Sequence, residues 1–318
     1  MEVWTSLESY NPDTYRPLIL ALGNFDGLHL GHQKILREVI ANAKKTNGRP
    51  AVLTFHEHPQ RVLHKSQDLR LLTSPEHRLF LFKELGIEIC FLLRFTIELS
   101  KILPERFVER CLVTQLGIRE VHLGYNAHFG HDRSGDCGLM RTLSKKFGFS
   151  FHETEPVTCG AEFVSSSLIR KKILKGDLLS AEALLGRPFS LFGTVIRGKG
   201  RGRTLGFPTA NLRPHSEILP PAGVYPVQVR QNLFHLKRIG NENQFMHESS
   251  EKGPWQEGIL NYGVRPTFAD VHRDLIPEVF LFNFDGNLYG KTLEVVFHPP
   301  LREEKTFNSS QELVCAVR

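Results

Sequence analysis

The sequence lacks the features that mark secreted, membrane and disulfide-bonded proteins. Its five cysteines among 318 residues are odd in number, widely spaced and free of any Cys-x-x-Cys pair. That pattern argues against a disulfide framework or a cysteine zinc site and favours a reducing compartment. No apolar run approaches the roughly 18 residues that span a bilayer, and the first eight residues show no basic stretch followed by an apolar one, so we expect no secretory signal. These absences predict a soluble cytoplasmic protein.

Biased composition is absent as well. Glycine (26) and proline (18) are ordinary for the length, and 41% hydrophobic with 23% charged residues excludes a disordered chain. A chain of this size predicts roughly two domains.

A large excess of one sign of charge is also absent, since the formal net charge is only +6. The one dense basic cluster is residues 197–203, RGKGRGR. Three interpretations stay open for it: a solvated flexible loop, a loop that grips nucleotide phosphates, or a nucleic-acid surface. The last is the weakest, because stacking aromatics are sparse around the cluster.

The first half of the chain alternates strand-like and helix-like patterns, which predicts a parallel sheet with helices on both faces. Apolar strand-sized runs predict strands, and apolar residues at helical spacing predict helices between them. The expected strands are 18–22, 51–55, 88–93 and 120–123, and the expected helices are 34–45, 76–85 and 104–116.

The second half consists of short β-rich runs between Gly, Pro, Asn and Asp turns, which suggests a small antiparallel barrel. A helix stopped by Gly186 and blocked by Pro188 marks the boundary, so we predict domains at 1–186 and 187–318. The polar stretch 231–257 is expected to be a long mobile loop between strands. The expected strands are 191–197, 224–230, 258–262, 278–284 and 292–297.

Residues 23–32, GNFDGLHLGH, lie between the first of those strands and the first helix. The carboxyl end of a strand is where ligands bind in open α/β sheets, and glycines with a helix N-terminus suit a phosphate. His29 and His32 are three apart and would project to the same side, where they could stabilise charge as pyrophosphate leaves an α-phosphate. The alternative is one capping and one surface histidine.

On these residues the sequence resembles the nucleotidylyltransferase superfamily, and in particular the bacterial bifunctional riboflavin kinase/FAD synthetases. Two later segments agree in order, residues 54–59 (TFHEHP) and 165–170 (SSSLIR). The resemblance implies a Rossmann-like FMN adenylyltransferase domain with a parallel sheet. It implies nucleotide or phosphate contacts from one set of residues, namely Gly23, Asn24, Phe25, Asp26, Gly31, Ser165, Ser166, Ser167 and Arg170. In physical terms the serines can cap a helix and Arg170 can neutralise phosphates.

The chain departs from the family at residues 124–130, GYNAHFG. Ala127 stands where the family has an aromatic residue, and His128 stands where it has an arginine. Asn126 and His128 remain candidate flavin contacts. His56 and His58 have the spacing of a metal pair, but the resemblance favours a nucleotide-wall role for this segment.

The segment 193–200 nearly matches a phosphate-binding Walker loop, but it has Gly where Ser or Thr must ligate magnesium and it opens no helix, so we reject it. Downstream, Thr209 and Asn211 are two apart in an extended segment and point to one face, where they offer two oxygens to magnesium with ATP. The sequence around them, PTAN, is equally compatible with a turn. The basic loop upstream could close over the phosphates.

Glu278 lies on the same side of its expected strand as Phe280, Phe282 and Phe284. Burying a carboxylate on an aromatic face costs free energy unless the group has a functional role. Glu278 is therefore a candidate general base. The alternative is a strand-end glutamate in solvent.

The string from 201 to 212, RGRTLGFPTANL, closely resembles the riboflavin kinase signature. The resemblance implies a six-stranded antiparallel barrel that holds magnesium–ATP through Thr209 and Asn211, with Glu278 deprotonating the ribityl hydroxyl. Arg302 and Phe207 are weaker flavin candidates. The expected phosphate loop contains Gly198, Gly200, Arg201, Gly202 and Arg203.

The sequence therefore predicts a cytoplasmic bifunctional enzyme that phosphorylates riboflavin to FMN and then adenylylates FMN to FAD, with riboflavin, FMN, ATP and Mg²⁺ as small-molecule partners. We expect no nucleic acid or membrane partner. Three alternatives remain: a riboflavin kinase with a degenerate first domain, a nucleotidylyltransferase for another acceptor, and a nucleic-acid-binding module.

Overall fold

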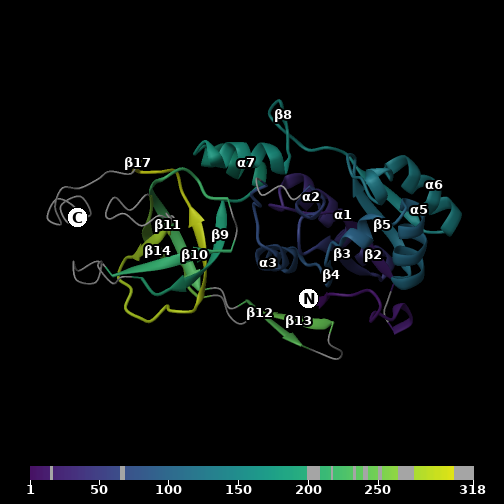
Figure 1. The fold of residues 1–318 in the computed structure, drawn as a ribbon, viewed down its shortest axis with the longest axis horizontal. Helices are drawn as coiled ribbons and strands as arrows, with labels where there is room; N and C mark the ends of the chain where they lie inside the picture. The colour runs from purple at the N-terminus through teal and green to yellow at the C-terminus, as the bar shows by residue number, and fades with distance from the viewer. Residues whose placement is uncertain are drawn as a thin grey trace. The chain divides into compact units, whose positions relative to one another are not determined.

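The structure is a computed structural model that describes residues 1–14, 17–64, 69–198, 208–215, 218–231, 234–238, 243–249, 253–263 and 276–303. The chain forms two compact units (Figure 1). Unit 1 comprises Met1–Arg70, Pro75–Ser166 and Phe234–Ser249, and unit 2 comprises Leu71–Ser74, Ser167–Leu233 and Ser250–Arg318. None of the helices in the described ranges has both the length and the apolar character needed to cross a membrane.

Six parallel strands make up the centre of unit 1, in the spatial order β1–β4–β3–β2–β5–β6. The central strands β2, β3 and β4 are buried on both faces, which is why they appear in the sequence as short continuous apolar runs. The strands are β1 (Glu2–Trp4), β2 (Leu18–Leu22), β3 (Arg49–Phe55), β4 (Ile89–Leu93), β5 (Ile118–Gly124) and β6 (Ser150–Thr154).

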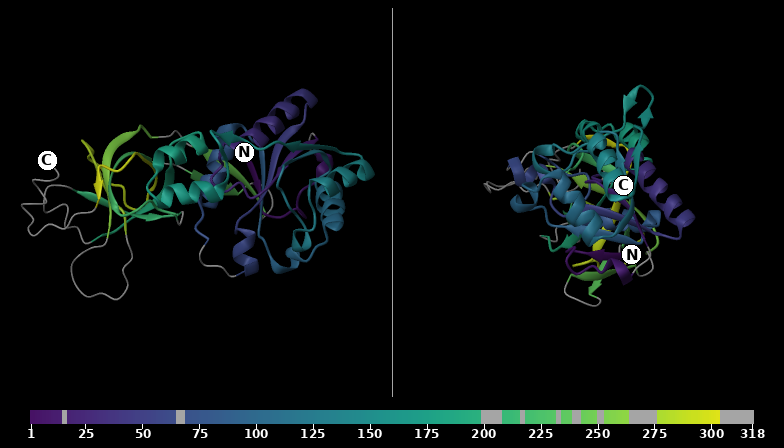
Figure 2. Two further views of the ribbon diagram at one scale, coloured as in Figure 1. Left: turned by 90° about the horizontal axis from the view of Figure 1, so that it is seen from above. Right: turned by 90° about the vertical axis from the view of Figure 1, so that its right-hand side faces the viewer.

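Helices cover both faces of this sheet (Figure 2). On one face α1 (Leu30–Thr46) and α3 (Pro75–Leu85) pack on the strands, and on the other the π-helix η2 (Phe107–Gln115) and α6 (Cys137–Phe147) do so. The remaining elements of unit 1 are short: η1 (Pro12–Thr14), α2 (Pro59–His64), α4 (Ile97–Ser100), α5 (Pro104–Arg106), η3 (His131–Arg133) and the hairpin β7 (Thr158–Cys159) with β8 (Glu162–Phe163).

Two strands from the second half of the sequence complete the sheet of unit 1. β13 (Gln244–Ser249) pairs antiparallel with β1, and β12 (Phe234–Arg238) pairs with β13 as the edge strand. The predicted loop at 231–257 is therefore wrong for these residues. The stretch is polar because antiparallel strands at the rim of a sheet can have one face toward solvent, and nothing in the local sequence indicates a partner near residue 2.

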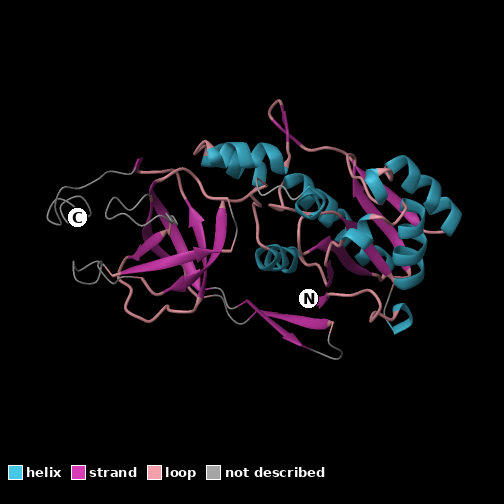
Figure 3. Ribbon diagram, in the orientation of Figure 1, coloured by secondary structure: helices cyan, strands magenta, loops and turns pink. Residues whose placement is uncertain are grey.

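Unit 2 is a closed antiparallel barrel preceded by two helices (Figure 3). β14 pairs with both β15 and β11, which closes the ring β14–β15–β10–β9–β16–β11. The predicted fold, a parallel α/β domain plus a six-stranded antiparallel barrel, is confirmed. The helices are α7 (Ser166–Leu174), whose first residue closes unit 1, and α8 (Leu178–Leu185), and the strands are β9 (Ser190–Ile196), β10 (Thr209–Pro214), β11 (Gly223–Gln231), β14 (Gln256–Tyr262), β15 (Glu278–Leu281), β16 (Thr292–Phe297) and β17 (Arg302–Glu303).

The strand expected at 278–284 is shorter than predicted. β15 ends at Leu281, and Asn283 turns the chain with a left-handed φ of 52°. Asparagine tolerates this conformation better than other residues with a side chain. Only Glu278 and Phe280 therefore share the face of a regular strand.

Candidate active sites

The loop of residues 23–29 lies at the carboxyl end of β2, where the strand order of unit 1 reverses. From β2 the chain continues through β3 and β4 on one side, whereas β5 pairs with the other side of β2. Ligands of open α/β sheets bind in the crevice at such a switch point. The loop therefore occupies the position expected of a nucleotide site.

The backbone of this loop is held in conformations that few residues adopt. Phe25, Gly27 and Leu28 have positive φ angles of 51°, 79° and 41°. Strain of this kind persists only where packing holds it and gathers at functional sites. The buried Phe25 ring makes edge contacts with Phe82 on α3 (5.7 Å between centroids) and with His32 (5.2 Å). Aromatic packing thus fixes the loop against α1 and α3.

The two histidines stack at the start of α1. His29 is the N-cap residue, its Nδ1 accepts a hydrogen bond from the backbone N–H of His32 (3.4 Å), and the ring centroids lie 3.6 Å apart. Since Nδ1 of His29 accepts, a neutral His29 carries its proton on Nε2 and can donate it to an oxygen. Burial, with His29 and Arg78 nearby, holds the pKa of His32 well below its usual value. A Cβ at Gly31 would come within 3.3 Å of the His29 ring, so glycine leaves the stack room.

Arg78 on α3 ties this loop to the end of β3. It is buried, and its two terminal nitrogens donate to the carbonyls of Asn24 (2.8 Å), Phe55 (2.8 Å) and His56 (3.2 Å) and to the hydroxyl of Thr54 (3.2 Å). Sequence reasoning missed this residue. An arginine inside an apolar helix was the available signal, but its partners are mostly main-chain carbonyls, which no motif displays.

The serine motif begins beside the histidine loop. The Ser166 hydroxyl donates to the carbonyl of Asp26 (2.8 Å), which is a buried residue of the loop. Ser165 precedes α7, and Ser166 is the first helical residue. Ser167 and Arg170 follow on α7 as part of unit 2. Within unit 1 the structure thus brings residues 23–32 and Ser166 together.

The histidines after β3 have separate partners. Nδ1 of His56 pairs with the Glu57 carboxylate at 3.2 Å, whereas Nε2 of His58 lies 3.5 Å from the side-chain nitrogen of Asn24. Neither histidine belongs to a group of three or more metal-ligating side chains among the described residues. Gly23 also belongs to this junction, since its N–H donates to the Leu53 carbonyl (3.2 Å) at the end of β3.

Asn126 and His128 follow β5, the other strand of the switch point. Both are exposed, and the carbonyl of Gly124 accepts the N–H of Ala127 (2.9 Å) in the turn that carries them. A Cβ at Gly124 would lie 3.8 Å from the Asn126 side-chain oxygen. The two candidate flavin contacts are therefore placed at the same end of the sheet as the histidine loop.

In unit 2 the kinase candidates lie in one row across neighbouring strands. Asn211 on β10 is the register partner of Glu278 on β15, which in turn faces Asn261 on β14, and Thr209 faces Phe280. Directly opposed residues share a face and have Cβ atoms about 4.5–5.5 Å apart. The barrel therefore places the predicted metal ligands and the predicted base on one face.

The Gly-rich loop is described only at its first residue. An added Cβ at Gly198 would fall 2.2 Å from the Asn211 side-chain nitrogen, so the chain passes directly over Asn211 there. Arg302 lies on β17, where it pairs with Val224 of β11. Five predicted residues lie outside the described part of the chain: Gly200, Arg201, Gly202, Arg203 and Phe207.

Both halves of the chain match known families. The FAD synthetase family model matches residues 11–168, and the riboflavin kinase model matches residues 185–318. A curated relative from Haemophilus influenzae, a bifunctional riboflavin kinase/FMN adenylyltransferase, is 35% identical over 92% of this chain and 89% of its own. This chain belongs to that family.

Other similarities cover the same length. Proteins of the same description from Listeria monocytogenes and Escherichia coli are 34% and 30% identical, each over 94% of this chain, and over 88% and 89% of their own. A solved structure titled a macrolide-efflux protein from Streptococcus pneumoniae superposes with a TM-score of 0.79 at 25% identity, over 99% of this chain and 95% of its own. The family's two-part architecture is thus present along the whole chain.

Proposed function

We propose that the chain carries out two consecutive transfers, in which ATP first phosphorylates riboflavin to FMN plus ADP and a second ATP then adenylylates FMN to FAD plus pyrophosphate. The observation that carries this proposal is the presence, in one chain, of the stacked His29–His32 pair at the switch point and of the Asn211–Glu278 row on the barrel. We assign adenylylation to residues 1–186 and phosphorylation to residues 187–318. We propose the cytoplasm as the compartment of both reactions, because the odd, widely spaced cysteines favour a reducing environment.

In the kinase step Glu278 takes the proton from the riboflavin 5′-hydroxyl, whose oxygen attacks the γ-phosphate in line. The donor set beside it consists of the Thr209 hydroxyl and the Asn211 amide oxygen, and hard oxygens of this kind fit magnesium. Magnesium bound with ATP supplies positive charge to the phosphates. The remaining task of the chain is to position the hydroxyl and the phosphate.

In the adenylylation step the FMN phosphate attacks the α-phosphate of ATP, and no covalent intermediate on the protein is needed. Neutral His29 donates from Nε2 to the α-phosphate oxygens, while the N-terminus of α1 contributes the positive end of the helix dipole. His32 stacks on His29 and stabilises its orientation. Ser166 and Arg170 are assigned to the departing phosphates.

The direct test is one incubation with riboflavin, excess ATP and magnesium, followed by chromatography of the three flavins over time. FMN should rise first and then give way to FAD. FMN that accumulates without FAD would support the kinase-only alternative, and the absence of any product from folded protein would refute the flavin assignment.

Two variants separate the sites. Glu278→Gln should reduce FMN formation by about 10²–10⁴-fold, the range of a general base, and leave FAD formation from supplied FMN intact. The double change His29→Ala and His32→Ala should do the reverse, with a loss of about 10²–10³-fold. Loss of both activities in either folded variant would contradict the two-site proposal.

A further inference from the structure

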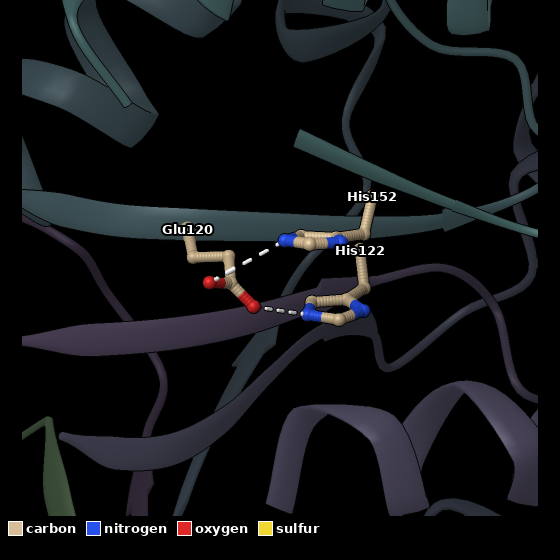
Figure 4. Close-up of side chains that lie close together, drawn as sticks. All are labelled: Glu120, His122 and His152. Atoms are coloured by element: carbon tan, nitrogen blue, oxygen red, sulfur yellow. Dashed lines mark hydrogen bonds and ion pairs between the residues drawn. The ribbon is translucent and has the colours of Figure 1, made fainter. Parts of the chain in front are cut away.

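A cluster of three metal-ligating side chains lies within unit 1, on β5 and β6 (Figure 4). Glu120 and His122 are two apart on β5 and so share one face of the sheet. His152 on β6 is the direct register partner of His122, which brings it to the same face. One ligand atom from each residue lies within 4.8 Å of the other two.

The carboxylate of Glu120 lies beside the stacked imidazoles, at the edge that carries both Nε2 atoms. Its Oε1 is 2.5 Å from Nε2 of His122, and its Oε2 is 3.5 Å from Nε2 of His152. The two rings stack with centroids 4.8 Å apart and an angle of 13° between their planes. Figure 4 shows both Nε2 atoms turned toward the carboxylate, so the three groups converge on one place.

A second set of groups orients these side chains. The Asn42 side-chain nitrogen donates to Oε1 of Glu120 (2.7 Å) from α1. Nδ1 of His122 is buried and has no hydrogen-bond partner among the described residues, yet a carboxylate oxygen of Glu38 lies 3.9 Å away. The Thr154 hydroxyl donates to that Glu38 oxygen (2.5 Å) and so fixes it. Metal-bound histidines usually donate their second N–H to a carboxylate, and Glu38 can take this role once the two groups approach to hydrogen-bond distance.

We propose that Glu120, His122 and His152 bind a divalent transition-metal ion of the zinc type, with water completing the coordination. Two imidazole nitrogens and one carboxylate oxygen are a ligand set that zinc accepts, whereas magnesium prefers oxygen alone. Nε2 of His122 faces Glu120 and is the ligand atom, which leaves Nδ1 on the side of Glu38. His152, whose side chain is 47% exposed, gives the ion access from solvent. The ion ties β6 to β5 and, through Glu38 and Asn42, to α1.

The test uses the full chain, stripped with a chelator and titrated with zinc chloride by calorimetry and with cobalt(II) by visible absorption. One zinc per chain and a cobalt spectrum typical of tetrahedral coordination are expected, with no competition from millimolar magnesium. His152→Ala should weaken zinc binding at least tenfold and abolish the cobalt spectrum. Glu38→Gln keeps every ligand and should weaken binding by about 10–100-fold.

A matched control excludes binding by histidines in general. His131 has a similarly exposed side chain (44%) and also has a carboxylate beside it, Asp132 at 3.4 Å, but among the described residues it belongs to no cluster of three metal-ligating side chains. His131→Ala should bind zinc as the unchanged chain does. Equal affinity in the unchanged chain and in His152→Ala, or an equal loss in His131→Ala, would overturn the proposal.

Discussion

Arg78 shows how one buried side chain can set the geometry of a whole loop. Its guanidinium reaches the carbonyls of Asn24, Phe55 and His56 at once, which a single ammonium on a flexible stem does not reproduce. Arg78→Lys should therefore misplace the loop and lower the rate of FAD formation from FMN by about 100-fold, the cost of a small displacement of reacting groups.

FMN formation should be unaffected in Arg78→Lys, because the kinase candidates lie on the barrel. Arg110→Lys, at an exposed position of η2 in the same unit, serves as the control and should change neither activity. Equal rates of FAD formation in the two variants would remove Arg78 from this role.

His32 should make unit 1 less stable in mild acid. Burial lowers the pKa of His32 in the folded protein, so below about pH 6.5 the unfolded chain binds a proton that the folded chain does not. The stability that His32 contributes is complete above that pH and falls as the pH drops toward the lowered value. Thermal midpoints measured between pH 7.5 and 5.5 should therefore decline, and the decline should be smaller in His32→Asn.

The exposed His128 provides the comparison for this measurement. His128→Asn should keep the full decline with pH. A slope in His32→Asn equal to that of the unchanged chain would show that other groups carry the pH dependence.

At this scale the sequence predicted where the candidate site residues lie better than it predicted the side chains that hold them in place. The spacing of His29 and His32 was enough to predict that their side chains lie on the same side at the start of α1, because helical geometry is local. The contacts of Arg78 and the convergence of His152 on Glu120 depend on strand order, which spacing along the chain does not encode.

Among the elements, closure of the barrel depends on a close approach at Gly258. A Cβ at this residue would lie 2.3 Å from the backbone oxygen of Phe280 on β15, a contact that no side-chain movement can relieve. Gly258→Ala should therefore separate β14 from β15, disturb Glu278 and abolish FMN formation, while FAD formation from FMN persists.

Gly253→Ala is the matched control, since a Cβ there meets its nearest atoms at an ordinary 3.6 Å. Both substitutions lie in the same part of unit 2, so flavin chromatography and the thermal midpoint can be compared directly. Full kinase activity in Gly258→Ala would mean that the β14–β15 pairing does not position Glu278.

The central elements were predictable because their sequence patterns reflect burial. Strands such as β2 and β4 are buried along their whole length, so their apolar runs are visible without a structure. β12 and β13 were not predicted because β12 is an edge strand that buries little, and because β13 pairs with β1, which is distant in sequence. β15 was predicted too long, since aromatic residues continue past the turn at Asn283.

For the whole molecule, the predicted domain boundary at residue 186 leaves two strands of unit 1, β12 and β13, in the second half of the chain. A fragment of residues 1–186 would lack β12 and β13 and leave the edge of β1 unpaired. Exposed edges pair with other chains, so the fragment should self-associate. Its thermal midpoint should also lie several degrees below that of unit 1 in the full chain, since about 1 kcal/mol corresponds to about 2–4 °C at this size.

A synthetic peptide of residues 234–249 should reverse both effects in the fragment, as measured by thermal unfolding and size-exclusion chromatography. A peptide with the same composition in scrambled order should not. If the fragment were monomeric and as stable as the full chain, the added strands would contribute nothing to the sheet.

The distance along the chain between β1 and β13 also bears on how the protein is made. Met1 and Met246 meet although 245 positions separate them, and a ribosome adds about 5–20 residues each second. The first strand to emerge therefore waits on the order of 10–50 s for its neighbour, with one edge open throughout. During that interval the open edges of nascent chains on the same mRNA can pair with one another. A chaperone that shields this edge should therefore raise the yield of the full-length enzyme.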